Sequence, residues 1–232
     1  MKTNHHTRRG FTLVELLVVI VIIAALAGLT APMVIRQRKK ADQTEAVNNA
    51  RQIGLALFEF ETEYGTFPDD ATATAVKDAT DTALVSGQTS NDRFRQLIRA
   101  GIAQSESMFY AKTGFTKKPD GILDTDQKAL SAGEVGFGII MDGGTRGLSA
   151  AGNPSRPIIA APFKVALDGT FDSDFYDGKA VVLKLDNSAT SLPIVKTSGN
   201  VKINGRSMLE TGADTVWGVT TVVPQWSYPQ PK

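Results

Sequence analysis

A long apolar run near the N-terminus dominates the hydrophobic pattern of the chain. Residues 11–35 contain a single charged residue, Glu15, and the basic residues Arg8 and Arg9 stand just before the run. A helix of roughly 20 apolar residues is long enough to cross a bilayer. A charge inside such a span costs about 3 kcal/mol, so it is usually kept for a function. The sequence therefore predicts a membrane-spanning helix in which Glu15 has a specific role.

The helical pattern continues beyond the apolar run. Small and apolar residues recur at alternating steps of four and three, which is the spacing of one helix face; they are Ala46, Ala50, Ile53, Leu57, Phe60 and Tyr64. Gly65 is expected to end the helix. We expect one helix over residues 11–64, about 80 Å long, with this face packed on a globular domain. A free coiled coil is the weaker alternative, because the face is short.

Two features mark the far half of the span. Pro32 removes a backbone donor and clashes with the preceding turn, so we expect a kink or local melting there. Four basic residues follow the span and mark the interface on the outer side of the membrane that it crosses. They are Arg36, Arg38, Lys39 and Lys40.

Residues 65–232 are numerous enough to form one globular domain. Residues 69–90 indicate a surface connection or a marginal helix, whereas Asn91 or Asp92 is expected to cap a helix that ends near Ala103. A short turn is expected over residues 107–111, and residues 112–133 are polar and rich in turn formers.

Short β-type segments follow in the last 100 residues. They cover residues 135–141, 158–163, 180–185, 191–195 and 201–203, and the close spacing of the last three favours an antiparallel sheet. Pro162 and Pro193 indicate edge strands or irregular segments, and Asp186-Asn187-Ser188 is a candidate hairpin connection. Residues 217–232 are expected to be extended. The predicted fold class is therefore α+β, with the long N-terminal helix packed on an antiparallel sheet.

The junction before the span resembles a known processing signal. Residues 8–16, RRGFTLVEL, resemble the cleavage and methylation signature of prepilins, which include type IV pilins and the pseudopilins of type II secretion. In that family a membrane peptidase cuts after the glycine and N-methylates the new terminal phenylalanine. The resemblance implies cleavage between Gly10 and Phe11 and methylation at Phe11. A plain signal anchor, or a secretory signal cut near Ala24–Ala27, is the alternative interpretation.

Cleavage at this junction would give Glu15 a partner. The mature subunit would begin with a protonatable amine at Phe11, four residues before the carboxylate. If helices pack side by side with a stagger, Glu15 of one subunit can neutralise the terminal amine of its neighbour, which removes much of the cost of burying either charge. The alternative is a carboxylate that stays near the headgroups or becomes protonated. Family members also carry a proline at the place of Pro32, where the helix can loosen in a filament.

Composition excludes most enzyme chemistry. The chain has no cysteine, and its two histidines, His5 and His6, lie in the predicted leader. A mature chain without His or Cys has no Ser-His-Asp triad, no Cys-His dyad and no zinc site built on those residues. The net charge of +1 becomes −2 once residues 1–10 are removed, so no nucleic-acid partner is expected. We expect no enzyme and no organic cofactor.

One acidic loop is a candidate calcium site. Asp168, Asp172, Asp174 and Asp177 offer several hard oxygen ligands within a short stretch. Major pseudopilins bind calcium in a C-terminal loop, although the spacing here fits neither that loop nor an EF-hand. Asp120, Asp124 and Asp126 form a weaker second cluster. The alternative in both places is an acidic turn in solvent.

The interpretation divides the chain into four parts: a leader at 1–10, an assembly helix at 11–35, its amphipathic continuation at 36–64 and a periplasmic domain at 65–232. The resemblance implies a pseudopilus or related filament subunit, anchored in the inner membrane with its N-terminus in the cytoplasm. Its partners would be the prepilin peptidase and methyltransferase, other pilin or pseudopilin subunits, and the assembly platform. A type IV pilus subunit is the alternative within the family, and an anchored periplasmic binding module that never polymerises is the alternative outside it.

Overall fold

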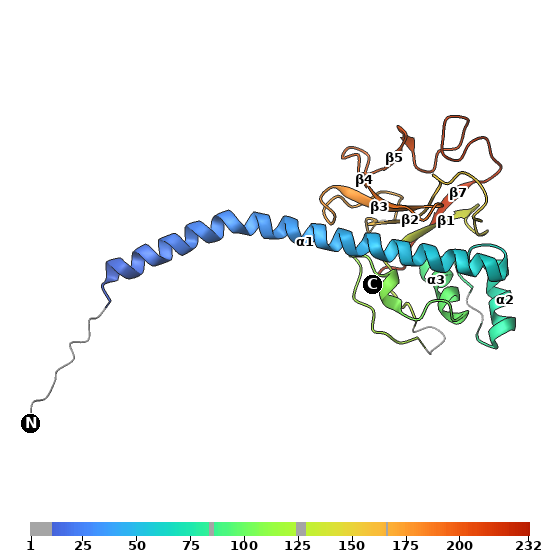
Figure 1. The fold of residues 1–232 in the computed structure, drawn as a ribbon, viewed down its shortest axis with the longest axis horizontal. Helices are drawn as coiled ribbons and strands as arrows, with labels where there is room; N and C mark the ends of the chain where they lie inside the picture. Colours follow the sequence, from blue (N-terminus) through green and yellow to red (C-terminus); the bar gives the residue numbers. More distant parts are fainter. Residues whose placement is uncertain (1–10, 84–85, 124–128, 166) are drawn as a thin grey trace, which may run out of the picture. The chain divides into compact units, whose positions relative to one another are not determined.

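The computed structural model describes residues 11–83, 86–123, 129–165 and 167–232 (Figure 1). The chain separates into two compact units, and the division falls between Arg38 and Lys39. The first helix, α1 (Leu13–Tyr64), contributes to both units. The second unit combines the C-terminal half of α1 with shorter helices and an antiparallel sheet, so the predicted α+β class is confirmed.

Helix α1 confirms the predicted long helix, because it runs for 52 residues and ends one residue before Gly65. Gly65 adopts a φ of 88° and donates its N–H to the Glu61 carbonyl at 2.7 Å, which closes the last turn. Of the kink or local melting expected at Pro32, the local melting is wrong, because the helix continues through this residue. The kink stays a prediction. A proline in a helix interior costs about 3 kcal/mol, because it removes the hydrogen bond to the carbonyl four residues earlier, here that of Gly28.

The predicted apolar face of α1 is the face that is buried. Ile53, Leu57 and Phe60 are fully buried. Gly54, which the spacing did not single out, lies close against the sheet: a Cβ there would lie 2.9 Å from Leu183 and 2.1 Å from the Asn187 side chain. Because glycine has no side chain, it permits this close packing of the helix against the sheet.

Five strands form the main sheet, in the order β4-β3-β2-β1-β7, and every neighbouring pair is antiparallel. The strands are β1 (Gly138–Asp142), β2 (Pro157–Ala161), β3 (Lys179–Lys184), β4 (Ala189–Pro193) and β7 (Pro224–Ser227). In Figure 1 the sheet lies along the C-terminal half of α1. The core strands β1 and β2 are buried along their whole length, which matches the apolar sequences of β2 and of residues 138–141 in β1.

Pro162 and Pro193 were predicted to mark edge strands or irregular segments. Pro193 ends the edge strand β4, as expected for a residue that cannot donate to a ladder. At Pro162 the second alternative, an irregular segment, is confirmed, because β2 is a central strand and Pro162 lies outside it. Strand β2 stops at Ala161, so the proline follows the strand and removes no ladder hydrogen bond. The predicted connection at residues 186–188 joins β3 to β4, with Asn187 at a φ of 60°.

Two other strands differ from the prediction. Residues 201–203 contribute β5 (Lys202–Ile203), which pairs with β6 (Arg206–Ser207) in a separate two-stranded sheet rather than in the main one. Asn204 and Gly205 connect them, and both have positive φ, as an Asn-Gly hairpin turn requires. The extended tail supplies β7, a fifth strand paired with β1 that the sequence pattern did not predict.

The helices after α1 also begin and end at other residues than expected. Helix α2 (Asp70–Thr80) has a capping box formed by Asp69 and Thr72, so residues 70–80 form a definite helix. Helix α3 (Ser90–Arg99) is capped by Thr89, and Asp92 completes that capping box, so the prediction of Asn91 or Asp92 as the cap is wrong. The helix ends before Gly101, whose φ of 76° stops it short of Ala103. A short 3-10 helix, η1 (Glu106–Phe109), follows.

Asn91 fixes the start of α3 to two distant segments. Its amide group donates to the Leu130 carbonyl at 2.8 Å and to the Ser131 carbonyl at 3.0 Å, and its oxygen accepts the Gln230 N–H at 2.7 Å. The Asn91 side chain is fully buried. If its amide group were removed, each of these partners would lose a hydrogen bond that water cannot replace.

The first prediction concerns the buried face of α1. Leu57→Ala should lower the free energy of unfolding by about 2–5 kcal/mol, because it leaves a cavity at a fully buried site. Leu55→Ala, two residues away with its side chain 62% exposed, is the matched control and should change it by less than about 0.5 kcal/mol. Denaturant titration of the full chain in detergent, followed by tryptophan fluorescence, measures both. Equal losses would contradict the assigned face.

A second prediction concerns Asn91. Asn91→Ala should lower the free energy of unfolding by about 2 kcal/mol or more, because three buried hydrogen bonds disappear. Asn48→Ala, on the exposed side of α1, removes the same side chain at a site where the loss should be small. The same titration compares the free energies of unfolding of the two variants. An Asn91→Ala variant as stable as the wild type would show that the amide does not hold the tail in place.

Candidate functional site

The N-terminal half of α1 exposes apolar side chains on every face. All residues from Phe11 to Arg38 are exposed, including the large aliphatic residues at every turn of the helix. A soluble helix normally hides one apolar stripe and shows a polar face to water. Among the described residues, α1 is the helix that is long and apolar enough to cross a membrane. A helix that is apolar all round requires either lipid or neighbouring helices to cover it.

Glu15 and Thr12 together form the first turn of this helix. One carboxylate oxygen of Glu15, Oε2, accepts hydrogen bonds from the Thr12 N–H and from the Thr12 hydroxyl, both at 2.8 Å. The Glu15 N–H in turn donates to the Thr12 hydroxyl oxygen at 3.2 Å. This reciprocal pairing is a capping box, which satisfies backbone donors that have no partner inside the helix.

Thr12 is the residue of this helix start that the sequence analysis missed. The spacing Thr-x-x-Glu before an apolar run is a known signal of a capping box, and Thr12-Leu13-Val14-Glu15 carries it. Within one subunit, Glu15 therefore has a polar partner for Oε2 at its own helix start. Its negative charge still has no cationic partner among the described residues of the apolar run.

The other residues predicted to take part in processing and assembly lie on the same segment. Phe11 precedes the helix and its side chain is 84% exposed, which leaves it accessible. Pro32 lies inside the helix. Gly10 and the rest of the leader lie outside the described residues, so the cleavage site stays a prediction.

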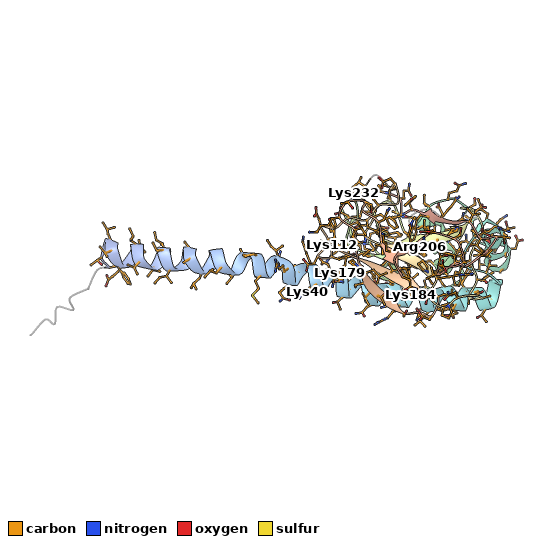
Figure 2. The ribbon with its side chains drawn as sticks, turned by 90° about the horizontal axis from the view of Figure 1, so that it is seen from above. Lys40, Lys112, Lys179, Lys184, Arg206 and Lys232 are labelled. Carbon is orange, nitrogen blue, oxygen red and sulfur yellow. The ribbon has the colours of Figure 1, made fainter. Side chains whose placement is uncertain are left out.

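Basic side chains follow the apolar run on α1. Arg36, Arg38 and Lys40 are exposed, and Lys40 is labelled in Figure 2. Further along, Asp42 of α1 forms an ion pair with Lys112, whose Nζ lies 2.8 Å from the carboxylate. The positive charges are therefore free to lie at a lipid headgroup boundary, whereas the helix beyond them is joined to the folded domain.

The four aspartates of the candidate calcium loop are at least partly exposed, and two of them stabilise local turns. Asp168 accepts hydrogen bonds from the Thr170 N–H and hydroxyl, and these bonds lower the pKa of its carboxyl below the usual value. Asp172 accepts the Asp174 N–H at 2.9 Å. Calcium at this loop stays a prediction. Of the weaker cluster, Asp124 and Asp126 lie outside the described residues.

Comparison with known proteins agrees with this N-terminal geometry. Residues 5–31 match the family model of the prokaryotic N-terminal methylation motif. The chain is 29% identical over 132 residues to the type II secretion system core protein G of Pectobacterium carotovorum subsp. carotovorum, an alignment that covers 56% of this chain and 72% of that protein. It is 28% identical over 141 residues to the protein of the same name from Escherichia coli K12, covering 60% of this chain and 83% of the relative. It is 29% identical to the Dickeya chrysanthemi protein of that name, and this alignment covers 63% of this chain and 97% of the relative.

No solved structure matches this chain. The methylation motif supports a class: the N-terminus is similar to that of prepilin-type proteins. Within that class its relatives are core proteins of type II secretion, and the chain resembles a pseudopilin. This likeness points to a structural subunit rather than an enzyme, and its N-terminal apolar helix is of the kind that anchors such subunits in a membrane.

Proposed function

We propose that this protein is a structural subunit of a type II secretion pseudopilus or a related pilin-like filament. It is made as a precursor, inserted in the inner membrane with its domain in the periplasm, cut between Gly10 and Phe11, and N-methylated at Phe11. It then polymerises through the N-terminal half of α1 with other pseudopilin subunits. The prepilin peptidase and the inner-membrane assembly platform are its partners in these steps.

The observation that carries this proposal is the lone carboxylate of Glu15 in an exposed apolar helix. Covering that helix with lipid or with neighbouring helices removes water from the charge, and an unpaired buried charge is strongly unfavourable. The capping hydrogen bonds from Thr12 satisfy one oxygen but supply no positive charge. The terminal amine of an adjacent subunit, created by cleavage before Phe11, supplies it.

The same argument explains a defined stagger between subunits. Arrangements that place Glu15 opposite a neighbour's apolar side chains leave both the acid and the amine unpaired. One axial offset between neighbouring subunits pairs the acid with the amine. The charge therefore selects the register between helices whose surfaces are otherwise apolar. Pro32 is the residue at which we expect α1 to loosen on packing in a filament.

A third prediction concerns processing. Intact mass spectrometry of the membrane-extracted protein should give the mass of residues 11–232 plus one methyl group, and fragmentation should place the methyl on the amine of Phe11. In a strain without prepilin peptidase, the same sample should show the full precursor. An unprocessed chain in the wild-type strain, or cleavage near Ala24–Ala27, would remove the prepilin assignment.

A fourth prediction separates the charge of Glu15 from its capping role. Glu15→Gln keeps an oxygen that can accept from Thr12 but removes the negative charge, so we expect normal membrane insertion and cleavage with filament assembly largely lost. Thr12→Val removes the hydroxyl and keeps the charge, and it should assemble. Glu59→Gln, at an exposed site on α1, is the matched charge control.

Two measurements compare these variants. The first is the yield of sheared filaments, checked by electron microscopy, and the second is the export of a protein secreted by the same system. If Glu15→Gln assembles as well as Glu59→Gln, the filament role of the charge is refuted. The remaining function would then be that of a membrane-anchored periplasmic module that does not polymerise.

A further inference from the structure

A cavity of about 310 Å³ lies where several distant segments of the domain meet. These segments are the exit from α1, the loop after β1, the start of β2, the end of β3 and the residues before β7. Sites for small ligands in proteins have volumes of roughly 300–1,000 Å³. This cavity therefore suits a ligand of about the size of one amino acid.

Part of the cavity wall is apolar and firmly packed. It consists of Leu148, Ile158, Leu185, Trp217 and Val222. Trp217 is 1% exposed, and its Nε1 donates a hydrogen bond to the Met208 carbonyl at 2.8 Å, which fixes the ring in place. Such a wall favours the apolar part of a ligand, because contact with it removes apolar surface from water.

Arg156 supplies a positive charge beside this apolar wall. Its Nη2 donates to the Trp217 carbonyl at 3.0 Å, and the guanidinium carbon lies 5.5 Å from the centre of the Trp217 ring. Its Nε is buried and makes no hydrogen bond. Among the described residues, no carboxylate forms an ion pair with Arg156. The half-buried guanidinium therefore lacks a counter-ion, which is costly where water is partly excluded.

The loop around Arg156 leaves space for its guanidinium. Gly152 has a φ of 128°, and a Cβ at this position would lie 2.5 Å from Nη1 of Arg156. A glycine permits both this backbone conformation and this close approach. The position of the guanidinium is thus set by the local backbone as well as by Trp217.

The opposite side of the cavity is tied to α1 and to the segment that follows it. The Ala150 N–H donates to both carboxylate oxygens of Glu61, at 2.8 and 3.0 Å. The Phe67 N–H donates to the Leu148 carbonyl at 2.9 Å. These bonds hold the loop after β1 in place, so the cavity is formed before any ligand arrives.

The other polar groups of the lining also favour an anion. Thr66 and Ser149 contribute hydroxyl groups that can donate hydrogen bonds. Asp142 lines the cavity as well, but it forms an ion pair with Arg146 and accepts the Val223 N–H at 2.9 Å. Its negative charge is therefore already compensated, whereas the charge of Arg156 is not.

We propose that this cavity binds a small apolar carboxylic acid in its ionised form. The carboxylate accepts hydrogen bonds from the Arg156 guanidinium, whose planar donors match carboxylate geometry, and from the two hydroxyl groups. The apolar group of the ligand, aromatic or branched, lies against Trp217 and its neighbours. A free acid and the C-terminal residue of a peptide share this chemistry. The site does not depend on polymerisation, so its test is independent of the filament proposal.

The test is isothermal calorimetry on the purified full chain in nonionic detergent, with N-acetyl-L-phenylalanine as the probe. We expect saturable binding of one molecule per chain with a Kd of about 1 mM or lower. N-acetyl-L-phenylalaninamide has the same shape without the negative charge, and it should bind about tenfold more weakly or worse. No saturable binding of the acid, or equal affinities for acid and amide, would overturn the proposal.

Two pairs of variants locate the site. Arg156→Met keeps an apolar stem and removes the charge, so it should weaken binding of the acid about tenfold or more, whereas Arg51→Met, at an exposed site on α1, should not. Ala151→Trp places a large side chain in the cavity lining and should block the probe. Its neighbour Ala150 is exposed and lies outside the lining, so Ala150→Trp should leave binding unchanged.

Thermal unfolding verifies that each variant is folded, and the Ala151→Trp pair decides the location if Arg156→Met is not. Full binding in folded Arg156→Met or Ala151→Trp would overturn the assignment to this cavity. A second comparison identifies the source of the ligand. A hexapeptide that ends in phenylalanine and binds as tightly as the probe would identify a peptide C-terminus, whereas binding of the probe alone would identify a free acid, and both results support the site.

Discussion

The arrangement of this molecule depends on one unpaired charge in an apolar helix. Glu15 is the single charged residue between Phe11 and Ile35, and the side chains around it are exposed on all sides of α1. Covering those side chains is favourable by about 25 cal/mol per Å² of buried apolar area, whereas burying the lone acid is costly. In the proposed filament, a positive group that arrives with the covering helix resolves the conflict.

The two halves of α1 use the same periodicity for different purposes. Beyond Lys39 the helix is amphipathic, and its face from Ala46 to Phe60 packs into the core of the domain. Before Arg36 it is apolar all round apart from Glu15, and nothing among the described residues covers it. The packed half fixes the helix to a stable domain, which leaves the other half available for contacts between subunits.

The sequence predicted features that local periodicity determines. The length of α1, its buried face and the hairpin at Asn187 follow from spacing and turn residues, and the structure confirms them. Contacts between distant segments were not predictable in this way. Strand β7 pairs with β1 across more than 80 residues, and Asn91 is a buried link rather than a cap because it meets the C-terminal tail. The carboxylates of Glu106 and Glu134, which have oxygens within 4.8 Å of each other, likewise come together only through tertiary folding. Thr12, Gly101 and Asn204-Gly205 did carry local signals, namely a capping box, a helix stop and a hairpin turn, that a closer inspection of the pattern would have found.

The most direct test of the central claim is a distance between subunits in the assembled filament. Filaments grown from an equal mixture of two subunit preparations, one with ¹³C-labelled Glu15 and the other with ¹⁵N-labelled Phe11, report contacts between different subunits in solid-state NMR. Pairing of the acid with a neighbour's amine predicts dipolar transfer between the Glu15 carboxylate carbon and the Phe11 nitrogen, consistent with a separation of about 4–6 Å. Well-ordered filaments that show no such transfer would contradict the account.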